Sequence, residues 1–238
     1  MNIEIITSFN EHYYNLIGKD SVTTWLEHWP KNLKLTCYVE EFELPNQKRI
    51  VQIPFTELGQ DYLDFQASNE NDRVKIFAKK AYSVIHAMKN STADRIIWID
   101  ADVITKEAIT QEFLESLCPN DTLATFMGVQ HHKVKGDPES EMVFSGETGF
   151  FVINKNHSDF VKFMVSYCDY YNQHKKENLR RFYDGDVFGA VVKSMPNTKF
   201  NDLAANIKKN AKTPLKHTEL GKYIHHFKSK GSKDNYAQ

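Results

Sequence analysis

Hydrophobic and polar positions along the chain predict strands and helices in turn. A β-like run at 3–7 leads through a polar loop into a helical stretch at 21–29, whose large apolar residues recur every three or four positions. Pro30 ends this stretch, and residues 33–39 then alternate as a strand does. A strand, a helix and a second strand in this order are typical of the first unit of a doubly wound α/β sheet.

The middle of the chain contains the clearest helix and the clearest buried strand. Residues 72–88 place their apolar side chains on one helical stripe. Residues 96–99 are continuously apolar, which is typical of a central parallel strand covered on both faces. Residues 40–70 predict a long loop with short elements, and residues 128–146 a polar surface loop. The other predicted elements are helices at 106–117 and 156–174, a short helix within 183–194, and strands at 122–127 and 149–153.

Composition and the absence of linkers indicate the class of protein and the number of domains. The chain has 238 residues, of which 41% are hydrophobic and 26% charged, and this balance is that of an ordinary soluble globular protein. Its 10 Gly and 7 Pro argue against a disordered chain. Because no internal repeat or linker divides the sequence, we expect a single α/β domain.

The net charge of -1 limits which kinds of molecule the protein is expected to bind. It argues against a nucleic-acid partner, because proteins that bind nucleic acid usually carry a basic excess. It is compatible with one phosphorylated small molecule, for which a few local charges suffice. The lysine-rich segment 208–233 is either a solvated face or a segment that meets phosphate groups.

Cysteine usage and apolar runs bear on the compartment. Three cysteines without a C-x-x-C spacing fit buried free thiols in a reducing compartment better than disulfides or a zinc site. No apolar run reaches the roughly 18 residues that a membrane helix needs, and the first residues lack the basic start of a signal peptide. We therefore expect a cytoplasmic protein without a membrane span.

The motif that carries chemistry is Asp100-Ala101-Asp102, directly after the apolar run 96–99. In open α/β sheets, ligands bind at the carboxyl ends of the strands. Two carboxylates spaced i and i+2 on a turning backbone can reach one ion, and their hard oxygens suit Mg²⁺ or Mn²⁺. A solvated turn is the alternative, but carboxylates at the end of a buried strand cost desolvation unless something compensates.

At this motif the sequence resembles the GT-A glycosyltransferases, which use nucleotide-sugar donors, and it is similar to glycosyltransferase family 8. The matching parts are the apolar strand with its D-x-D at 96–102 and the N-terminal strand at 3–10. The resemblance implies a single GT-A-like, Rossmann-like α/β domain with a mixed, mostly parallel sheet flanked by helices. Residues 1–105 would form the nucleotide-binding half, 106–221 the sugar and acceptor half, and 222–238 a tail that closes on the donor.

The resemblance also implies a donor site. The family often has a basic residue in an F-x-x-K pattern before the D-x-D, which here makes Lys80 the candidate and Lys79 the alternate. A solvated helix lysine is the other interpretation. Tyr13 would stack on the nucleotide base or pack against its neighbours. The residues implied in donor binding are Thr7, Ser8, Asn10, Tyr13, Lys80 and, in the tail, Lys228 and Lys233.

Three acids would contact the transferred sugar and the acceptor. Glu147 lies two residues before Gly149, which permits a close backbone approach ahead of a buried strand. Asp184 and Asp186 open a predicted helix, where one of them would act as a general base or orient the sugar. The alternatives are a surface turn for Glu147 and helix capping for the aspartate pair.

The third metal ligand would come from a histidine pair near the C-terminus. In family 8 a late His joins the two Asp, and a following Gly and Lys meet the diphosphate. The spacing from His226 to Lys233 is compatible, so His226 is favoured over His225. The sequence departs from the family at Ser229, where Gly is usual.

Together these features predict a hexosyltransferase that moves a sugar from a nucleotide-sugar donor, a UDP-sugar by family prevalence, to a glycan, lipid or protein acceptor. Mn²⁺ or Mg²⁺ would be held by Asp100, Asp102 and His226. A haloacid-dehalogenase-like phosphatase would instead use Asp100 as its nucleophile, although that motif normally stands near the N-terminus. A nucleotidyltransferase would need a glycine-rich first loop, which 7–10 lacks. A degenerate nucleotide- or sugar-binding module would not need all the acidic and histidine elements.

Overall fold

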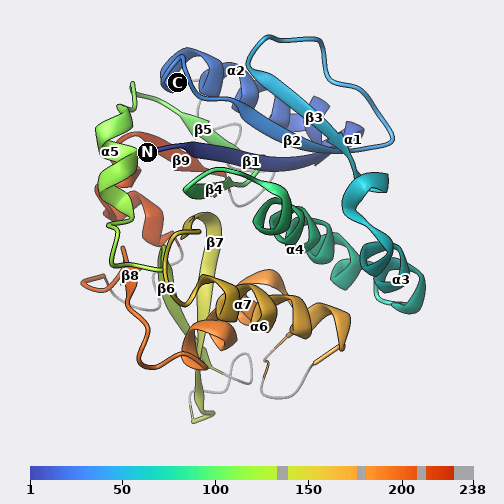
Figure 1. The fold of residues 1–238 in the computed structure, drawn as a ribbon, viewed down its shortest axis with the longest axis vertical. Coiled ribbons are helices and arrows are strands. Elements are labelled where there is room, and N and C mark those ends of the chain that lie inside the picture. Colours follow the sequence, from blue (N-terminus) through green and yellow to red (C-terminus); the bar gives the residue numbers. More distant parts are fainter. Residues whose placement is uncertain (133–138, 176–178, 180, 208–212, 228–238) are drawn as a thin grey trace.

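The computed structural model describes the chain except for residues 133–138, 176–178, 180, 208–212 and 228–238. Its centre is a seven-stranded sheet with the order β3-β2-β1-β4-β7-β6-β8, and a two-stranded sheet of β5 and β9 lies beside it (Figure 1). The strands are β1 Ile3–Asn10, β2 Leu35–Glu40, β3 Ile50–Pro54, β4 Arg95–Ile99, β5 Val103–Thr105, β6 Ala124–His132, β7 Met142–Asn154, β8 Phe200–Asp202 and β9 Ile224–His226.

Helices cover both faces of the large sheet. The α-helices are α1 Glu11–Tyr13, α2 Lys19–His28, α3 Gln60–Ser68, α4 Asp72–Asn90, α5 Gln111–Leu117, α6 Phe160–Asn172 and α7 Asp184–Lys193. A π-helix, η1 Tyr14–Gly18, joins α1 to α2, and the 3-10 helices are η2 Phe55–Leu58, η3 Pro214–His217 and η4 Leu220–Lys222.

The sheet is mixed, as the family resemblance implies. Strands β3, β2, β1 and β4 run parallel, β7 runs antiparallel to both β4 and β6, and β8 is parallel to β6. Four of these six pairings are therefore parallel, which confirms a mostly parallel sheet. Parallel neighbours bring their carboxyl ends to one edge, where β1 and β4 end at Asn10 and Ile99.

Strand β4 is buried along its whole length, because each face lies against a separate hydrophobic core. Ile96 and Trp98 belong to a core built with residues of α3, α4, α6 and α7. Ile97 and Ile99 belong to a second core built with residues of α2 and α5. The continuous apolar run at 96–99 is thus explained by two-sided burial, as predicted.

Two segments differ from the sequence expectation. Residues 40–70 contain β3, η2 and α3 rather than mainly loop; β3 is an edge strand with three exposed residues among its five, so it lacks a clear apolar pattern. The surface loop expected at 128–146 is wrong for residues 128–132 and 142–146, because β6 extends to His132 and β7 begins at Met142, and these two residues pair. The outer end of β7 is exposed or half-buried, which removes the alternation that identifies a strand.

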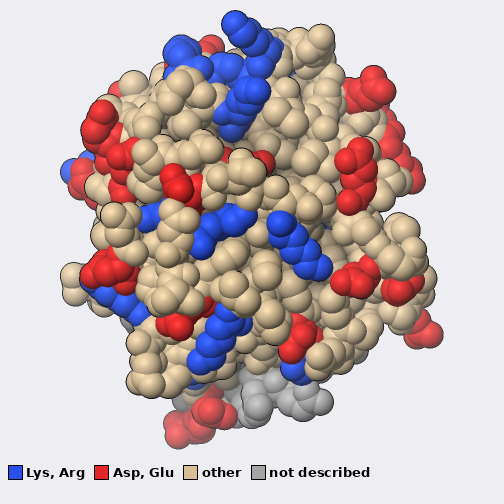
Figure 2. Space-filling model, in the orientation of Figure 1, with Lys and Arg blue, Asp and Glu red and all other residues tan. Residues whose placement is uncertain are grey.

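Helix boundaries also shift. The helix expected at 106–117 begins at Gln111, where the Thr110 side chain caps it, and the helix expected at 156–174 covers Phe160–Asn172. Among the described residues, no helix is long and apolar enough to cross a membrane. The three cysteines are buried and free. Acidic and basic side chains both lie on the face drawn in Figure 2, in separate small groups.

The short sheet of β5 and β9 joins the C-terminal part of the chain to the strand after the D-x-D motif. Val103 pairs with His226 and Thr105 with Ile224 in antiparallel register. The amide of Phe227 donates a hydrogen bond to the Asp102 carbonyl at 3.0 Å. This pairing fixes His226 next to the carboxyl end of β4.

Candidate metal centre and ligand cavities

The backbone turns sharply where β4 ends, and this turn presents two carboxylates. The amide of Val103 donates to the Asp100 carbonyl at 3.1 Å, which closes the turn. The amide of Asp100 donates to the Gly149 carbonyl on β7 at 2.9 Å, so the turn is also tied to the neighbouring strand. The backbone that carries the Asp100 and Asp102 side chains at the sheet edge is therefore held in place by hydrogen bonds.

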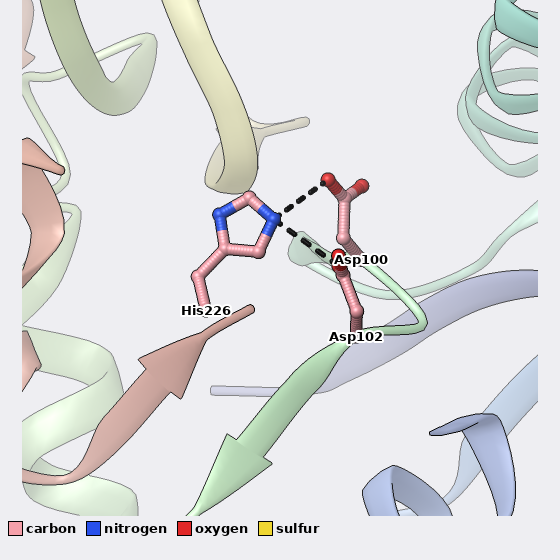
Figure 3. A group of neighbouring side chains, drawn as sticks. All are labelled: Asp100, Asp102 and His226. Atoms are coloured by element: carbon pink, nitrogen blue, oxygen red, sulfur yellow. Dashed lines mark ion pairs between the residues drawn. The ribbon is translucent and has the colours of Figure 1, made fainter. Parts of the chain in front are cut away.

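His226 lies opposite these carboxylates (Figure 3). Its Nε2 is 3.1 Å from Asp102 Oδ1 and 3.5 Å from Asp100 Oδ2. One ligand atom from each of the three residues lies within 4.8 Å of the others. His225, one position earlier on the strand, instead packs its ring edge-on against Phe227, with the ring centroids 4.6 Å apart. The structure therefore brings His226, and not His225, to the D-x-D motif.

The surroundings of His226 favour positive charge. Burial acts to lower the pKa of the imidazole, but the neighbouring carboxylates of Asp102, Glu147 and Asp100 raise that pKa to about 10. The three carboxylates therefore stabilise positive charge at this point. Two carboxylates and an imidazole also form a donor set that Mn²⁺ accepts, while carboxylate oxygens suit Mg²⁺. The residues present therefore fit a divalent metal ion.

Lys80 connects the D-x-D motif to the first turn of α7. Its Nζ donates to Asp100 Oδ1 at 2.7 Å and to the Thr148 carbonyl at 2.5 Å, and it lies 2.8 Å from Asp184 Oδ2. Burial acts to lower the pKa of Lys80, but the two carboxylates outweigh it and the pKa is raised. Lys80 is therefore buried and charged rather than a solvated helix lysine. The alternate, Lys79, pairs with Glu40 at 2.5 Å.

A cavity of about 440 Å³ opens beside the cluster. Four of the residues predicted to bind the donor, Ser8, Asn10, Tyr13 and Lys80, line it together with Asp100 and Asp102. Thr7 is buried within β1 and is not among the lining residues.

Tyr13 has a contact that the sequence did not indicate. Its hydroxyl donates to Asp102 Oδ2 at 3.1 Å, and burial together with this carboxylate raises its pKa. Asn10 caps the short helix α1 by accepting from the Tyr13 amide at 2.7 Å, which holds Tyr13 at the cavity wall.

A second cavity of about 240 Å³ lies between β6, β7 and the start of α7. Glu147, Asp184 and Asp186, the three acids predicted to contact sugar and acceptor, all line it. Asp100 and Asp184 line both cavities, so the two spaces meet at these carboxylates.

The acids on α7 do not cap their own helix. The helix begins after Tyr183 without a side-chain cap, so capping does not explain the pair. Asp184 Oδ2 accepts from the Thr148 hydroxyl at 2.6 Å, and Asp186 Oδ1 accepts from the Ser145 hydroxyl at 2.5 Å. Asp186 also faces Arg181 at 3.5 Å. Both carboxylates dock α7 against β7.

The comparison with solved structures identifies the architecture. Mouse xyloside xylosyltransferase 1, in its apo form, aligns with 96% of this chain and 98% of its own, with a TM-score of 0.60 and 14% identity. The mannosyltransferase Ktr4p from S. cerevisiae aligns with 85% of this chain and 67% of its own, with a TM-score of 0.54 and 11% identity.

The chain has the GT-A glycosyltransferase fold. At these identities the likeness establishes the fold alone, so membership of family 8 stays a prediction. The bifunctional glycosyltransferase WbbM aligns with a TM-score of 0.53 and 13% identity, and this chain spans 39% of that protein. No protein-family model and no curated protein sequence matches the chain.

Within this GT-A domain, three residues of the site were not found from the sequence. Trp98 donates through Nε1 to Asp100 Oδ1 at 2.7 Å, although its place in an apolar run indicated only core packing. Thr148 and Ser145 hold the acids of α7 from β7. No sequence signal links β7 to α7, because the pairing depends on how the helix crosses the sheet. Two predicted donor-binding residues, Lys228 and Lys233, lie outside the described residues.

Proposed function

We propose that this GT-A chain is a glycosyltransferase that uses a divalent metal ion and a nucleotide-sugar donor, with a UDP-sugar as the first candidate. One observation carries the proposal: Asp100, Asp102 and His226 gather their ligand atoms within 4.8 Å beside the 440 Å³ cavity. This cluster stands at the carboxyl edge of the sheet, where open α/β sheets bind their ligands.

The proposed metal ion is Mn²⁺ or Mg²⁺. When bound, it would supply positive charge that stabilises the leaving nucleoside diphosphate. The cavity contains no lysine outside an ion pair among its described lining residues, because Lys79 and Lys80 each contact a carboxylate. A diphosphate there would otherwise meet the carboxylates of Asp100 and Asp102 directly. This electrostatic demand is the reason we infer metal dependence.

The two cavities suggest how donor and acceptor are divided. We assign the larger cavity, beside Ser8, Asn10 and Tyr13, to the nucleotide, within the proposed nucleotide-binding half 1–105. The smaller cavity would receive the acceptor, a glycan, lipid or protein, within the half 106–221.

The acids follow from this division. Asp184 lines both spaces, so we assign it to the transferred sugar. Asp186 and Glu147 line only the smaller cavity and would face the acceptor side. The identity of the sugar is open.

The phosphatase alternative receives no support from the site. It needs Asp100 as a nucleophile, yet Asp100 Oδ1 already accepts hydrogen bonds from Lys80 and Trp98, and Oδ2 faces His226. The GT-A architecture also gives no reason to prefer it. We therefore do not retain it as a second function.

Thermal unfolding in the presence of nucleotides tests the proposal. A ligand that binds only the folded chain at 100 times its Kd adds about 2.7 kcal/mol to the stability. For a chain of this size that corresponds to a rise in Tm of several degrees. We expect UDP with Mn²⁺ to give this rise and UDP with EDTA to give much less. If no nucleoside diphosphate stabilises the chain in the presence of Mn²⁺, the proposal is wrong.

A further inference from the structure

The imidazole of His226 has a third carboxylate, that of Glu147, on the side away from the D-x-D motif. Nε2 faces Asp100 and Asp102, while Nδ1, on the other edge of the ring, lies 3.4 Å from Glu147 Oε1. Nδ1 is buried and makes no hydrogen bond within the part of the chain that the structure describes, so an acceptor for its proton has to come from a neighbouring side chain. Among the described residues, Glu147 is the ion-pair partner that the structure gives to this nitrogen.

Gly149 makes this arrangement possible. A Cβ at this position would overlap the His226 ring at Nδ1 and Cε1, so only glycine leaves room for the ring. The Gly149 amide also donates to Glu147 Oε1 at 3.3 Å, and its carbonyl accepts from the Asp100 amide at 2.9 Å. The stretch from Glu147 to Gly149 on β7 therefore contacts both Asp100 and His226.

The chemistry of histidine ligands gives this contact a purpose. A neutral imidazole offers one nitrogen to a metal ion only when the other carries the proton. Histidines that bind metals usually donate this other N–H to a carboxylate or carbonyl, which fixes the orientation of the ring. Glu147 stands where such an acceptor is needed.

We propose that Glu147 is a positioning residue for the metal centre: its carboxylate accepts the Nδ1–H of His226 and directs Nε2 toward the ion. This inference rests on the metal site of the proposed function. It gives Glu147 a role in metal affinity in addition to its place beside the smaller cavity.

Mn²⁺ titration by calorimetry, without nucleotide or sugar, tests the inference on the full chain. We expect Glu147→Ala to weaken the Kd for Mn²⁺ by roughly 10- to 100-fold, which is typical of outer-shell partners. Glu147→Gln should lose less, because its amide oxygen still accepts the Nδ1–H. Glu57→Ala is the matched control: it removes an exposed carboxylate that lines neither cavity, and it should leave the Kd unchanged.

A double-mutant cycle separates positioning from simple loss of negative charge. If Glu147 acts through His226, then adding Glu147→Ala to His226→Ala should change the Kd for Mn²⁺ very little. An equal loss in both backgrounds would overturn the inference, because it would mean that Glu147 acts only as a nearby charge. Melting curves without metal show whether each variant is folded, and Glu147→Gln serves in the cycle if the alanine variant is not.

The outcomes also separate this inference from the proposed function. Wild-type chain that binds Mn²⁺, with Glu147→Ala binding equally well, overturns the role of Glu147 and leaves the metal site intact. Wild-type chain that binds no Mn²⁺ overturns both.

Discussion

The chain contains two D-x-D pairs, at Asp100 with Asp102 and at Asp184 with Asp186, and the structure uses them differently. The side chains of the first pair are 26% and 12% exposed, and their oxygens face His226 and the larger cavity. The side chains of the second pair are 8% and 3% exposed. Hydroxyl groups of β7 donate to both members of the second pair.

The difference shows that spacing alone does not make a ligand site. A carboxylate can bind an ion only where its neighbours leave an oxygen available. At β4 the turn directs Asp100 Oδ2 and Asp102 Oδ1 to one point. At α7, one oxygen of each acid, Asp184 Oδ2 and Asp186 Oδ1, accepts a hydrogen bond from β7 that fixes the helix to the sheet. Lys80 joins the two pairs, because its Nζ contacts Asp100 and Asp184.

The largest effect is expected from Asp102→Ala in the first pair. It removes a metal ligand, and we expect metal-dependent UDP-sugar hydrolysis or transfer to fall by about 10³-fold, equivalent to roughly 4 kcal/mol of transition-state stabilisation. Stability should fall less than in Asp184→Ala, since the carboxylates of Asp100 and Glu147 remain beside His226. Release of UDP, with melting curves in parallel, measures both. A marked loss of stability with activity retained would remove the distinction between the two pairs.

Asp184→Ala in the second pair should add a marked loss of stability to the loss of activity expected from its place beside the transferred sugar. It takes one of two carboxylates from the buried Lys80 and leaves the Thr148 hydroxyl without its acceptor. Breaking a buried ion pair typically costs 3–5 kcal/mol, and we expect about 3 kcal/mol here because Asp100 remains. Urea unfolding measures the change. Unfolding at the wild-type midpoint would contradict a docking role for Asp184.

Two glycine substitutions test the same difference between the first and second D-x-D pairs. A Cβ at Gly149 would overlap the His226 ring, whereas a Cβ at Gly185 would overlap the Gly146 carbonyl on β7. Overpacking of this kind costs about 1–3 kcal/mol. We expect Gly149→Ala to weaken Mn²⁺ binding and Gly185→Ala to lower the free energy of unfolding. The comparison fails if calorimetry and urea unfolding show the same profile for both variants.

The smallest effect is expected from Tyr13→Phe. This change removes the hydrogen bond to Asp102 Oδ2 and leaves the ring in place. A hydrogen bond to a charged group contributes about 1.5–3 kcal/mol when buried, and Tyr13 is 37% exposed, so we expect about 1 kcal/mol. Because RT is about 0.6 kcal/mol, a loss of this size corresponds to a roughly fivefold weaker Kd for Mn²⁺. A change beyond about 20-fold would mean that Tyr13 does more than hold Asp102.

Much of the fold could be predicted from periodicity. The apolar stripe at 72–88 predicts α4, which covers Asp72–Asn90, and the apolar run at 96–99 predicts β4. Both elements are buried on the faces that the pattern describes, so hydrophobic burial explains both the apolar pattern and the packing of these elements. The strands predicted at 122–127 and 149–153 are the inner parts of β6 and β7. Their outer pairing, of 128–132 with 142–146, was missed because the outer end of β7 is exposed or half-buried, and pairing between backbones leaves no mark on side-chain polarity.

Local sequence pattern accounts for the first part of the site. Two acids after a buried strand must lie at a sheet edge, whatever the rest of the chain does, and this made Asp100 and Asp102 metal candidates. The other parts of the site depend on contacts between distant segments. His226 reaches the motif through three residue pairs between β5 and β9, Glu147 stands behind it on β7, and the second acid pair is held by β7. These contacts depend on strand register and helix crossing, which are set by the packing of the whole domain and are encoded in no local pattern.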